Sequence, residues 1–567
     1  METMEEDIKP LISKGKPKGG LRTLPFILGS QGFEKMASFG LMPNMVLYLT
    51  RVFRMDVAAA TNVIMLWSAA TYLMPIIGAF LADSFVGRYP TIAFGTVVNV
   101  LGTLLFWLTT MIPQLSPSCD QITKSCSSAT AAQLAFLYVS FGLMAIGAGG
   151  VRASSLAFGM DQLKNNNAGI RENYFNWTYA ITTMAILVGM TVLVYLQENL
   201  GWKVGFGVPV VLMLISMVSF LLGSSFYVKL EVKGNVMSNC AQVVVASCKN
   251  RHLNLPPYFS DGMYYSENDS AMFMPSDKLR FLNKACLIKN PQEDLTQDGR
   301  AKNPWSLCTV QQVEALKSLI KIIPIWISGM IMSVNMSQGS LFILQAYSMD
   351  RHITPDFQIP AGSIGTFLIF SAIFWIFFYD RIIIPLASKV RGQPTRLRVK
   401  QKMGIGLFAV CLSIASLAIV EGVRRQLAIE EGFQDHPEGV VSMSVLWLLP
   451  RQFLDGFAEV FFGVGQNEFY ITELPQSMSS IASCLPGLGN SGSHLISSII
   501  LSIIDKVTKA GGGVSWVSSN INQGHLDYYC WVIFGIMVLN VLYFLYCSKA
   551  YGPCKGEKNE GQDEGHC

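Results

Sequence analysis

The first residues that could do chemistry lie inside an apolar stretch, FILGSQGFEKMASFG, at residues 26–40. Glu34 and Lys35 place a carboxylate and an ammonium group side by side there, and Gln31 adds an amide three residues earlier. Apolar surroundings favour the neutral form of a carboxylate, whereas a nearby cation favours the ionised form, so such a pair can respond to protons. An amide does not titrate in this range. The stretch therefore predicts a proton-responsive pair, Glu34 and Lys35, beside a non-titrating Gln31.

Other charges inside apolar runs are Arg152 in the first half of the sequence, and Asp455 and Glu459 in the second half. A charge within the membrane is costly, so such residues usually face a cavity or pair with each other. One interpretation is a set of fixed ion pairs that hold helices together. The other is a gate, because a pair that bridges the two halves can open when its carboxylate takes up a proton. Asp455 lies one turn before Glu459 on the same helical face, where it either acts on Glu459 or pairs with Arg451.

Membrane-spanning helices must position these charges. The chain has 567 residues, of which 51% are hydrophobic and 14% are charged, against roughly 25% charged residues in soluble proteins. A bilayer core about 30 Å thick needs roughly 20 apolar residues per helix. Lipid offers the backbone no hydrogen bonds, so these spans must be helices. We identify twelve such runs, at residues 25–50, 59–82, 90–113, 131–158, 175–197, 205–227, 315–345, 361–380, 402–422, 443–467, 478–504 and 528–547.

The only long break between spans divides the chain into two groups of six. Basic residues gather in the N-terminal tail and at 381–402, whereas the loop at 423–442 holds Arg424 and Arg425 beside four acidic residues. Because positive charge favours the cytoplasmic side, both termini and the central linker are predicted to be cytoplasmic. The predicted organisation is a tail at 1–24, a six-helix bundle at 25–227, a linker at 228–314, a second six-helix bundle at 315–548 and a tail at 549–567.

Two six-span halves are typical of a transporter whose halves rock around a central site. A channel is the rival, but the sequence contains no repeat that resembles a selectivity filter. It also contains no metal-ligand cluster, G-x-S-x-G or P-loop, so we predict neither an enzyme nor a bound cofactor or metal. The formal net charge of +4 gives no reason to expect a nucleic-acid partner. Cys119 and Cys126 share a predicted exoplasmic loop, where an oxidising compartment would allow a disulfide, and the sequence leaves their state open.

Six segments together carry a resemblance to a known family. They are FEKMASFGLMPNMVLYLT (33–50), GAFLADSFVGRYPTIAF (78–94), GAGGVRASSLAFGMDQ (147–162), IPIW (323–326), DRHI (350–353) and FAEVFFGVGQNEFYITELP (457–475). Their order and spacing, over about residues 19–550, resemble the plant nitrate and peptide transporter family, which belongs to the proton-coupled oligopeptide group of the major facilitator superfamily. The resemblance implies an all-α integral membrane protein with twelve transmembrane helices in two six-helix bundles and a long central cytoplasmic loop. It also implies proton-coupled transport of a small molecule or anion.

The family's first-helix motif, E-x-x-E-R/K, corresponds here to Gln31, Glu34 and Lys35, so an amide replaces the first acid. The resemblance implies proton coupling through Glu34, Lys35 and Glu459, with Gln31 at the substrate site. Because the motif is incomplete, facilitated diffusion is the rival. The family's basic residue of the fourth helix and its Glu of the tenth correspond to Arg152 and Glu459. They are expected to form a gating salt bridge that only Glu459 can release by protonation, and Arg152 is also expected to bind an anionic substrate group.

Five further positions take their expected roles from the same resemblance. Asp83 and Arg88 correspond to a superfamily loop that fixes helix ends, which implies a conformational role. Thr91 corresponds to a position that is phosphorylated in some members, so it is a candidate target of a regulatory kinase. Met336 corresponds to a nitrate-binding His of one branch, and Ser340 to the hydroxyl position near it, which makes both candidate substrate-binding residues. Met donates no hydrogen bond to nitrate but packs well against apolar ligands.

Two interpretations of the substrate follow. The family favours nitrate or another small solute, whereas Met336 and Gln31 favour plant hormones or glycosylated specialised metabolites, moved by a uniporter or an exporter. A non-transporting nutrient sensor is the alternative of another class. The expected partners are the substrate, protons, membrane lipid and a regulatory kinase. The expected location is the plasma membrane, with the vacuolar membrane as the alternative.

Overall fold

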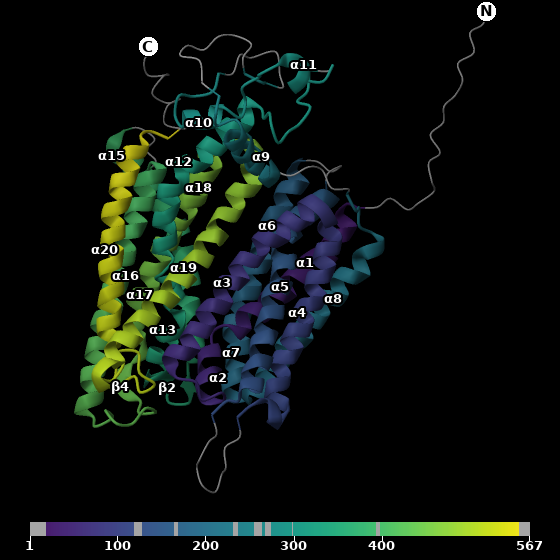
Figure 1. The fold of residues 1–567 in the computed structure, drawn as a ribbon. Helices are drawn as coiled ribbons and strands as arrows, with labels where there is room; N and C mark the ends of the chain where they lie inside the picture. Colours follow the sequence, from purple (N-terminus) through teal and green to yellow (C-terminus); the bar gives the residue numbers. More distant parts are fainter. Residues whose placement is uncertain are drawn as a thin grey trace, which may run out of the picture.

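The computed structural model describes residues 19–117, 128–163, 168–230, 236–253, 264–266, 274–297, 299–392 and 397–554. Cys119 and Cys126 lie outside the described residues, so their disulfide stays a prediction. Figure 1 shows two groups of long helices side by side, with short linker helices at one end and strands at the other. These two ends of the molecule are called the linker end and the strand end below.

The first bundle contains the helices of the N-terminal half. Its elements are α1 (Leu24–Leu41), α2 (Met45–Arg51), α3 (Val57–Leu81), α4 (Arg88–Met111), α5 (Ala131–Gln162), α6 (Ala168–Val188), α7 (Val194–Asn199) and α8 (Gly201–Leu222).

The second bundle contains the helices of the C-terminal half. Its helices are α12 (Val310–Met332), α13 (Gly339–Tyr347), α14 (Thr366–Phe378), α15 (Ile384–Arg391), α16 (Val399–Glu430), α17 (Leu449–Ala458), α18 (Gly465–Glu473), α19 (Ser479–Lys509) and α20 (Leu526–Tyr551). Short strands lie beside them at the strand end. There β1 (Met349–Asp350) pairs in parallel with β4 (Val441–Ser444), and β2 (His352–Thr354) pairs antiparallel with β3 (Phe357–Gln358).

Ten segments of the described residues are long and apolar enough to cross a membrane. α1 and the continuous α17–α18 segment are not among them, because buried polar residues such as Glu34 and Asp455 lower their hydropathy. Both nevertheless run along the bundles, since α1 packs against α8 and α17 packs against α16. With these two, twelve helices cross the membrane, which confirms the predicted fold.

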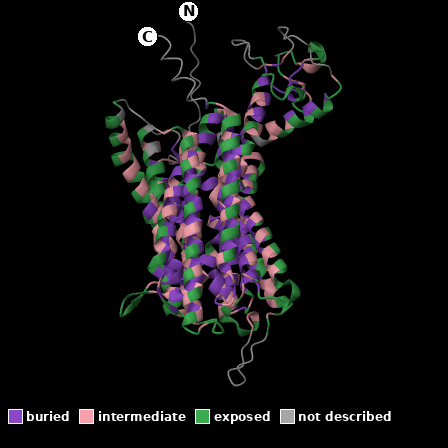
Figure 2. Ribbon diagram, turned by 90° about the vertical axis from the view of Figure 1, so that its left-hand side faces the viewer, coloured by how far each residue is buried: buried purple, intermediate pink, exposed green. Residues whose placement is uncertain are grey.

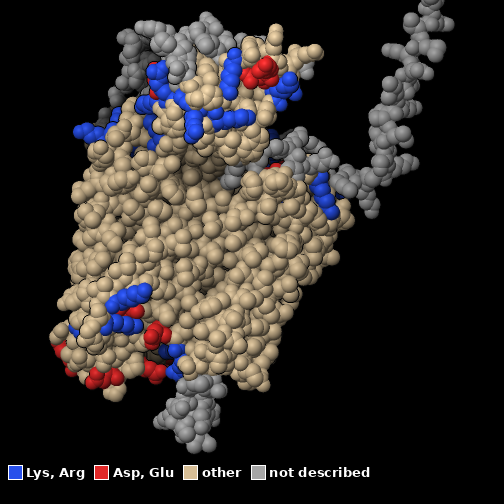
Figure 3. All heavy atoms as spheres, in the orientation of Figure 1, with Lys and Arg blue, Asp and Glu red and all other residues tan. Residues whose placement is uncertain are grey.

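The outer surface of the helices is suited to lipid. Apolar side chains such as Phe370, Phe377 and Leu542 are exposed on it, while Figure 2 shows the buried residues concentrated inside the molecule. On the face shown in Figure 3, charged side chains gather at the two ends and a broad belt between them holds almost none. Exposed apolar groups are stable in that belt because lipid surrounds them. Lys and Arg dominate the linker end of this face, as the positive-inside rule predicts for a cytoplasmic side.

Polar contacts join the two bundles toward the strand end. Asn62 of α3 accepts a hydrogen bond from Ser498 at 2.8 Å and donates one to Ser502 at 3.1 Å, which ties α3 to α19. At the strand end, Arg351 of the second bundle donates to a Glu198 carboxylate oxygen at 2.9 Å. These contacts close the strand end of the molecule.

The linker is partly folded. α12 begins at Val310, inside the predicted linker, because Thr309 caps it: the Gln312 backbone N–H donates to the Thr309 hydroxyl at 3.2 Å, and the Thr309 N–H donates to the Gln312 side chain at 2.9 Å. The described linker residues also include α9 (Val236–Lys249), α10 (Arg280–Asn283) and α11 (Pro291–Asp294). Val243, Leu282 and other apolar residues of this region pack into a small core against the start of α12.

Candidate functional site

The carboxylate of Glu34 is the centre of a charged cluster inside the first bundle. Its side chain is only 2% exposed. Arg152 of α5 donates from Nε to Glu34 Oε1 at 3.3 Å, and Lys35 Nζ lies 4.0 Å from Oε2. Ser38, one helical turn along α1, donates to Oε1 at 2.8 Å. Two cations and a hydroxyl therefore surround this buried carboxylate.

Glu459 occupies a different environment. It is the first residue of a π-helical segment, η10 (Glu459–Val464), that joins α17 to α18. No ion pair of the described residues involves it. The side chain is also exposed, although it lies among the helices. Glu459 is therefore accessible and lies outside the ion pairs of the described residues.

The predicted salt bridge between Arg152 and Glu459 is not among the ion pairs of the described residues. Arg152 instead pairs with Glu34, which belongs to the same bundle. The expected salt bridge between Arg152 and Glu459 therefore stays a prediction.

The other predicted substrate-site residues are spread over both bundles. Gln31 is buried in α1 near Tyr174, and its Nε2 has no hydrogen-bond partner within the part of the chain that is described. Met336 begins the short 3-10 turn η6 (Met336–Gln338), and Ser340 lies in the first turn of α13. Both are half-buried. The structure thus brings Gln31 and Glu34 together on one helix and leaves Met336 and Ser340 on the second bundle.

The helix-end residues form a compact ion-pair group near the linker end. Arg88 donates to Asp83 at 3.0 Å and to Asp161 at 2.7 Å. Gly87 precedes it with φ of 89°, a backbone conformation that favours glycine. Thr91 is 9% exposed and donates from its hydroxyl to the Gly87 carbonyl at 2.8 Å. A kinase could reach this hydroxyl only after the local structure opens.

Two residues that the sequence did not single out meet at the contact between the bundles. Tyr72 of α3 and His494 of α19 stack with ring centroids 5.6 Å apart and an angle of 14°. The enclosed Nδ1 of His494 has no hydrogen-bond partner among the described side chains. The sequence carried no usable signal for either residue, because a lone aromatic residue or histidine in a span is usually only part of the packed core.

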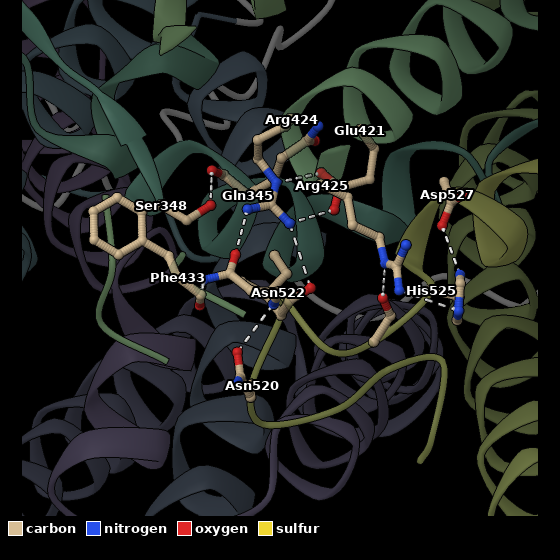
Figure 4. Close-up of polar contacts among 12 residues, drawn as sticks. Gln345, Ser348, Glu421, Arg424, Arg425, Phe433, Asn520, Asn522, His525 and Asp527 are labelled. Atoms are coloured by element: carbon tan, nitrogen blue, oxygen red, sulfur yellow. Dashed lines mark hydrogen bonds and ion pairs between the residues drawn. The ribbon is translucent and has the colours of Figure 1, made fainter. Parts of the chain in front are cut away.

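A second buried polar network lies near the strand end of the second bundle (Figure 4). Arg424 and Glu421 are both 0% exposed, and two guanidinium nitrogens of Arg424 donate to the Glu421 carboxylate at 2.9 and 2.8 Å. A third donates to Asn522 at 2.7 Å. The expectation that Arg424 and Arg425 lie in a polar loop is therefore wrong, since α16 continues to Glu430. Glu421 and Arg424 lie within one helical turn and neutralise each other, so both can be buried in the helix.

Asp455 takes part in a third buried group. Arg451 Nε lies 3.4 Å from its carboxylate, which confirms the interpretation that these two residues pair. Asn335 also donates to Asp455 at 2.8 Å, and Ser413 donates to it as well. With three partners, Asp455 joins α17 to α16 and to the turn that follows α12.

Comparisons with known proteins agree with this architecture. A family profile described as "PTR2: POT family" matches residues 89–517. "Protein NRT1/ PTR FAMILY 1.2" of Arabidopsis thaliana is 48% identical over 97% of this chain and 92% of its own length. "Protein NRT1/ PTR FAMILY 1.1" of the same plant is also 48% identical, over 97% of this chain and 94% of its own length.

Solved structures show the same fold. The crystal structure of an auto-inhibited POT family peptide transporter has a TM-score of 0.67 at 17% identity, and the match covers 94% of this chain and 98% of that one. The structure of the POT family transporter PepTSo has a TM-score of 0.68 at 17% identity, with the same two shares covered. The family predicted from the sequence is confirmed, together with a multi-pass membrane architecture.

Proposed function

We propose a function from the premise that this chain belongs to the POT family of membrane transporters: it carries nitrate or another small solute across a plant membrane together with protons. The two bundles would expose a central site alternately to each side of the membrane. The contacts that close the strand end fit a conformation in which this site opens toward the linker end, the predicted cytoplasmic side.

The charge balance around the central site is the observation that carries the proposal. Glu34, Lys35 and Arg152 together have one negative and two positive charges, and Glu459, which the resemblance assigns to the same central site, adds one negative charge. The net charge of these four residues is zero when Glu459 is ionised and plus one when Glu459 is protonated. A proton on Glu459 therefore creates the net positive charge that an anion needs, so one anion and one proton bind together.

Glu459 is better suited than Glu34 to carry the proton. Glu34 is held by Arg152, Lys35 and Ser38, and each of these contacts favours its ionised form. Glu459 has no such partner among the described ion pairs, and its side chain is accessible. Gln31 contributes no proton in this scheme, so we expect coupling through fewer sites than the complete family motif would provide. Facilitated diffusion is the rival.

A second candidate substrate is an amphipathic organic solute, such as a plant hormone or a glycosylated specialised metabolite. The half-buried Met336 supports it, because a thioether offers apolar contact and no hydrogen-bond donor. For this second candidate substrate, the transporter would work as a uniporter or as an exporter. The relatives' membership of a transporter family argues against the third candidate, a non-transporting nutrient sensor, and any measured flux would exclude it.

Uptake by oocytes that express the chain tests the proposal. Nitrate, a dipeptide, plant hormones and glycosides would be offered with and without an inward proton gradient, and mass spectrometry would measure the internal solutes. Gradient-driven accumulation of nitrate is the expected result. Equilibration without accumulation would refute proton coupling, and accumulation of an organic solute alone would refute the anion assignment.

The cellular setting is proposed from the same resemblance. We place the protein in the plasma membrane, surrounded by lipid, with a regulatory kinase acting on Thr91. A fluorescent fusion that marks only the vacuolar membrane would contradict the first point. Phosphopeptide mapping from plant tissue that covers Thr91 and never finds it modified would contradict the second.

A further inference from the structure

A groove of about 1160 Å³ lies on the second bundle, far from the central charges. One wall is formed by η8 (Tyr379–Ile383) and α15, and the other by the start of α16 and the last turns of α20. Figure 1 places these helices on the side of the second bundle that is away from the first bundle, with α15 at the linker end. The groove therefore meets lipid on the predicted cytoplasmic side. Its volume exceeds the roughly 300–1,000 Å³ of typical small-molecule sites.

One wall of the groove carries an exposed apolar stripe. Ile382, Leu386 and Val390 line the groove at intervals of four residues, a spacing that places side chains on one helical face. They are 44%, 60% and 79% exposed. The main contacts of α15 are with η8, the segment that it continues. Acyl chains seated in the groove would cover this stripe and fill the space between α15 and its neighbours.

The end of the groove nearest the linker is positively charged. Arg398 is the exposed residue that precedes α16, and Lys400 lies in the first turn of that helix. Lys400 donates from Nζ to two carbonyl oxygens at the end of α20, which holds its charge in this place. The described residues that line the groove include no Asp or Glu, and Asp380, which follows a lining residue, is itself followed by Arg381.

The charged and apolar parts of the groove are separated along the helices. Ile405, a lining residue of the apolar part, lies seven residues after Arg398 on α16. At 1.5 Å per residue this separation is about 10 Å. A molecule that fits the whole groove therefore has a negatively charged group at one end and long apolar chains at the other.

We propose that this groove binds one anionic phospholipid of the cytoplasmic leaflet, with the headgroup at Arg398 and Lys400 and the acyl chains along the stripe of Ile382, Leu386 and Val390. Anionic lipids are concentrated in that leaflet, and basic pockets between membrane helices suit their headgroups. The bound lipid would join α15 to α16 and α20. This site is independent of the transported solute. A zwitterionic lipid and a second copy of the chain are the competing occupants.

Two variants separate the headgroup contact from the acyl-chain contact. Arg398→Gln removes one positive charge from the headgroup end and keeps a polar side chain. Its matched control is Lys389→Gln, because Lys389 is exposed on α15 and is not among the residues that line the groove. Ala387→Phe places an aromatic ring in the groove, since Ala387 lines it, and removes no polar side chain.

Native mass spectrometry of the purified full-length chain is the first readout. Phosphatidylserine and phosphatidylcholine with identical acyl chains would be titrated separately, and the wild type should bind phosphatidylserine more tightly. Arg398→Gln should weaken phosphatidylserine binding about fivefold, because one basic residue near an anionic lipid contributes about 1 kcal/mol. Lys389→Gln should bind like the wild type, and Ala387→Phe should weaken the binding of both lipids.

Three results of this titration would overturn the proposal. Equal binding of the two lipids would show that the positive charge selects no headgroup. Equal losses in Arg398→Gln and Lys389→Gln would show a general effect of charge instead of a site. A purified chain that is a dimer and binds neither lipid would show that a second copy covers the stripe.

Photo-crosslinking locates the lipid on the wild-type protein and so does not depend on the folding of any variant. Vesicles of phosphatidylcholine would contain a small fraction of phosphatidylserine with a diazirine on one acyl chain, and the labelled peptides would be identified by mass spectrometry. Labelling should concentrate at residues 378–390 and 544–548, the apolar walls of the groove. Uniform labelling of all lipid-facing helices, or labelling only at another place, would overturn the proposal.

Discussion

Replacing Glu459 with Gln should convert a proton-driven accumulator into a passive carrier. Glu34, Lys35, Arg152 and Glu459 have a net charge of zero, which becomes plus one when Glu459 binds a proton. One proton per anion drives about tenfold accumulation for each pH unit across the membrane, since one unit corresponds to about 1.4 kcal/mol. Gln at this position keeps the net charge at plus one without a proton. The expected accumulation ratio then falls from about ten to about one.

Proteoliposomes measure this ratio directly. The membrane potential is held at zero with valinomycin and equal potassium concentrations, one pH unit is imposed with the acid side outside, and labelled nitrate is counted inside at equilibrium. Wild-type protein should approach the tenfold limit. The Glu459→Gln variant should fill the vesicles only to the outside concentration. Glu459→Asp is the control that keeps a carboxylate and should retain accumulation.

Two outcomes would refute the argument. If Glu459→Gln still accumulates nitrate like the wild type, the proton is carried elsewhere, and Glu34 becomes the candidate despite its cationic partners. If the variant neither accumulates nitrate nor equilibrates it, Glu459 is needed for the conformational cycle itself and the charge-balance argument is insufficient.

Three further predictions concern other contacts of the chain. Gln31→Glu adds a titrating group to α1, so uptake should depend more steeply on pH, and an unchanged pH profile would count against any role for this position. Ser38→Ala removes the 2.8 Å hydrogen bond to Glu34 and should lower the uptake rate by roughly tenfold at equal surface amount; wild-type kinetics would contradict this. Arg424→Met leaves Glu421 buried and unpaired and should cost about 3–5 kcal/mol of unfolding free energy, measured by SDS titration. The double variant Glu421→Leu/Arg424→Met should recover most of that loss, so additive losses would refute the argument.

The membrane-spanning helices could be predicted from the sequence because the lipid bilayer restricts the backbone to few structures. A run of about twenty apolar residues must be helical in the membrane, whatever packs around it. The hydropathy of α1 is too low to identify it as a membrane-spanning helix. It could still be recognised as one because apolar residues flank Glu34 and Lys35 on both sides. For α16, the sequence prediction ended the helix at residue 422, because Arg424 and Arg425 suggested a loop, whereas α16 continues to Glu430. Glu421 three residues earlier was the available signal, since charges at this spacing pair along a helix.

The partners of the charged residues could not be predicted in the same way. Arg152 pairs with Glu34 and not with Glu459 among the described ion pairs, and this choice depends on how the helices are placed in space rather than on any local pattern. Tyr72 and His494 meet only because α3 and α19 pack together, although they are far apart in the sequence.

The ion pair between Glu34 and Arg152 has a consequence for how the protein is made. The two residues are 118 positions apart, and a growing chain reaches the membrane one helix at a time. Until α5 has been synthesised, Glu34 has only Lys35 and Ser38 to compensate its charge. We expect α1 to wait in the translocation machinery or at the membrane surface until α5 arrives. Substitutions that weaken this pair should therefore reduce the amount of protein delivered to the membrane before they change how each molecule works.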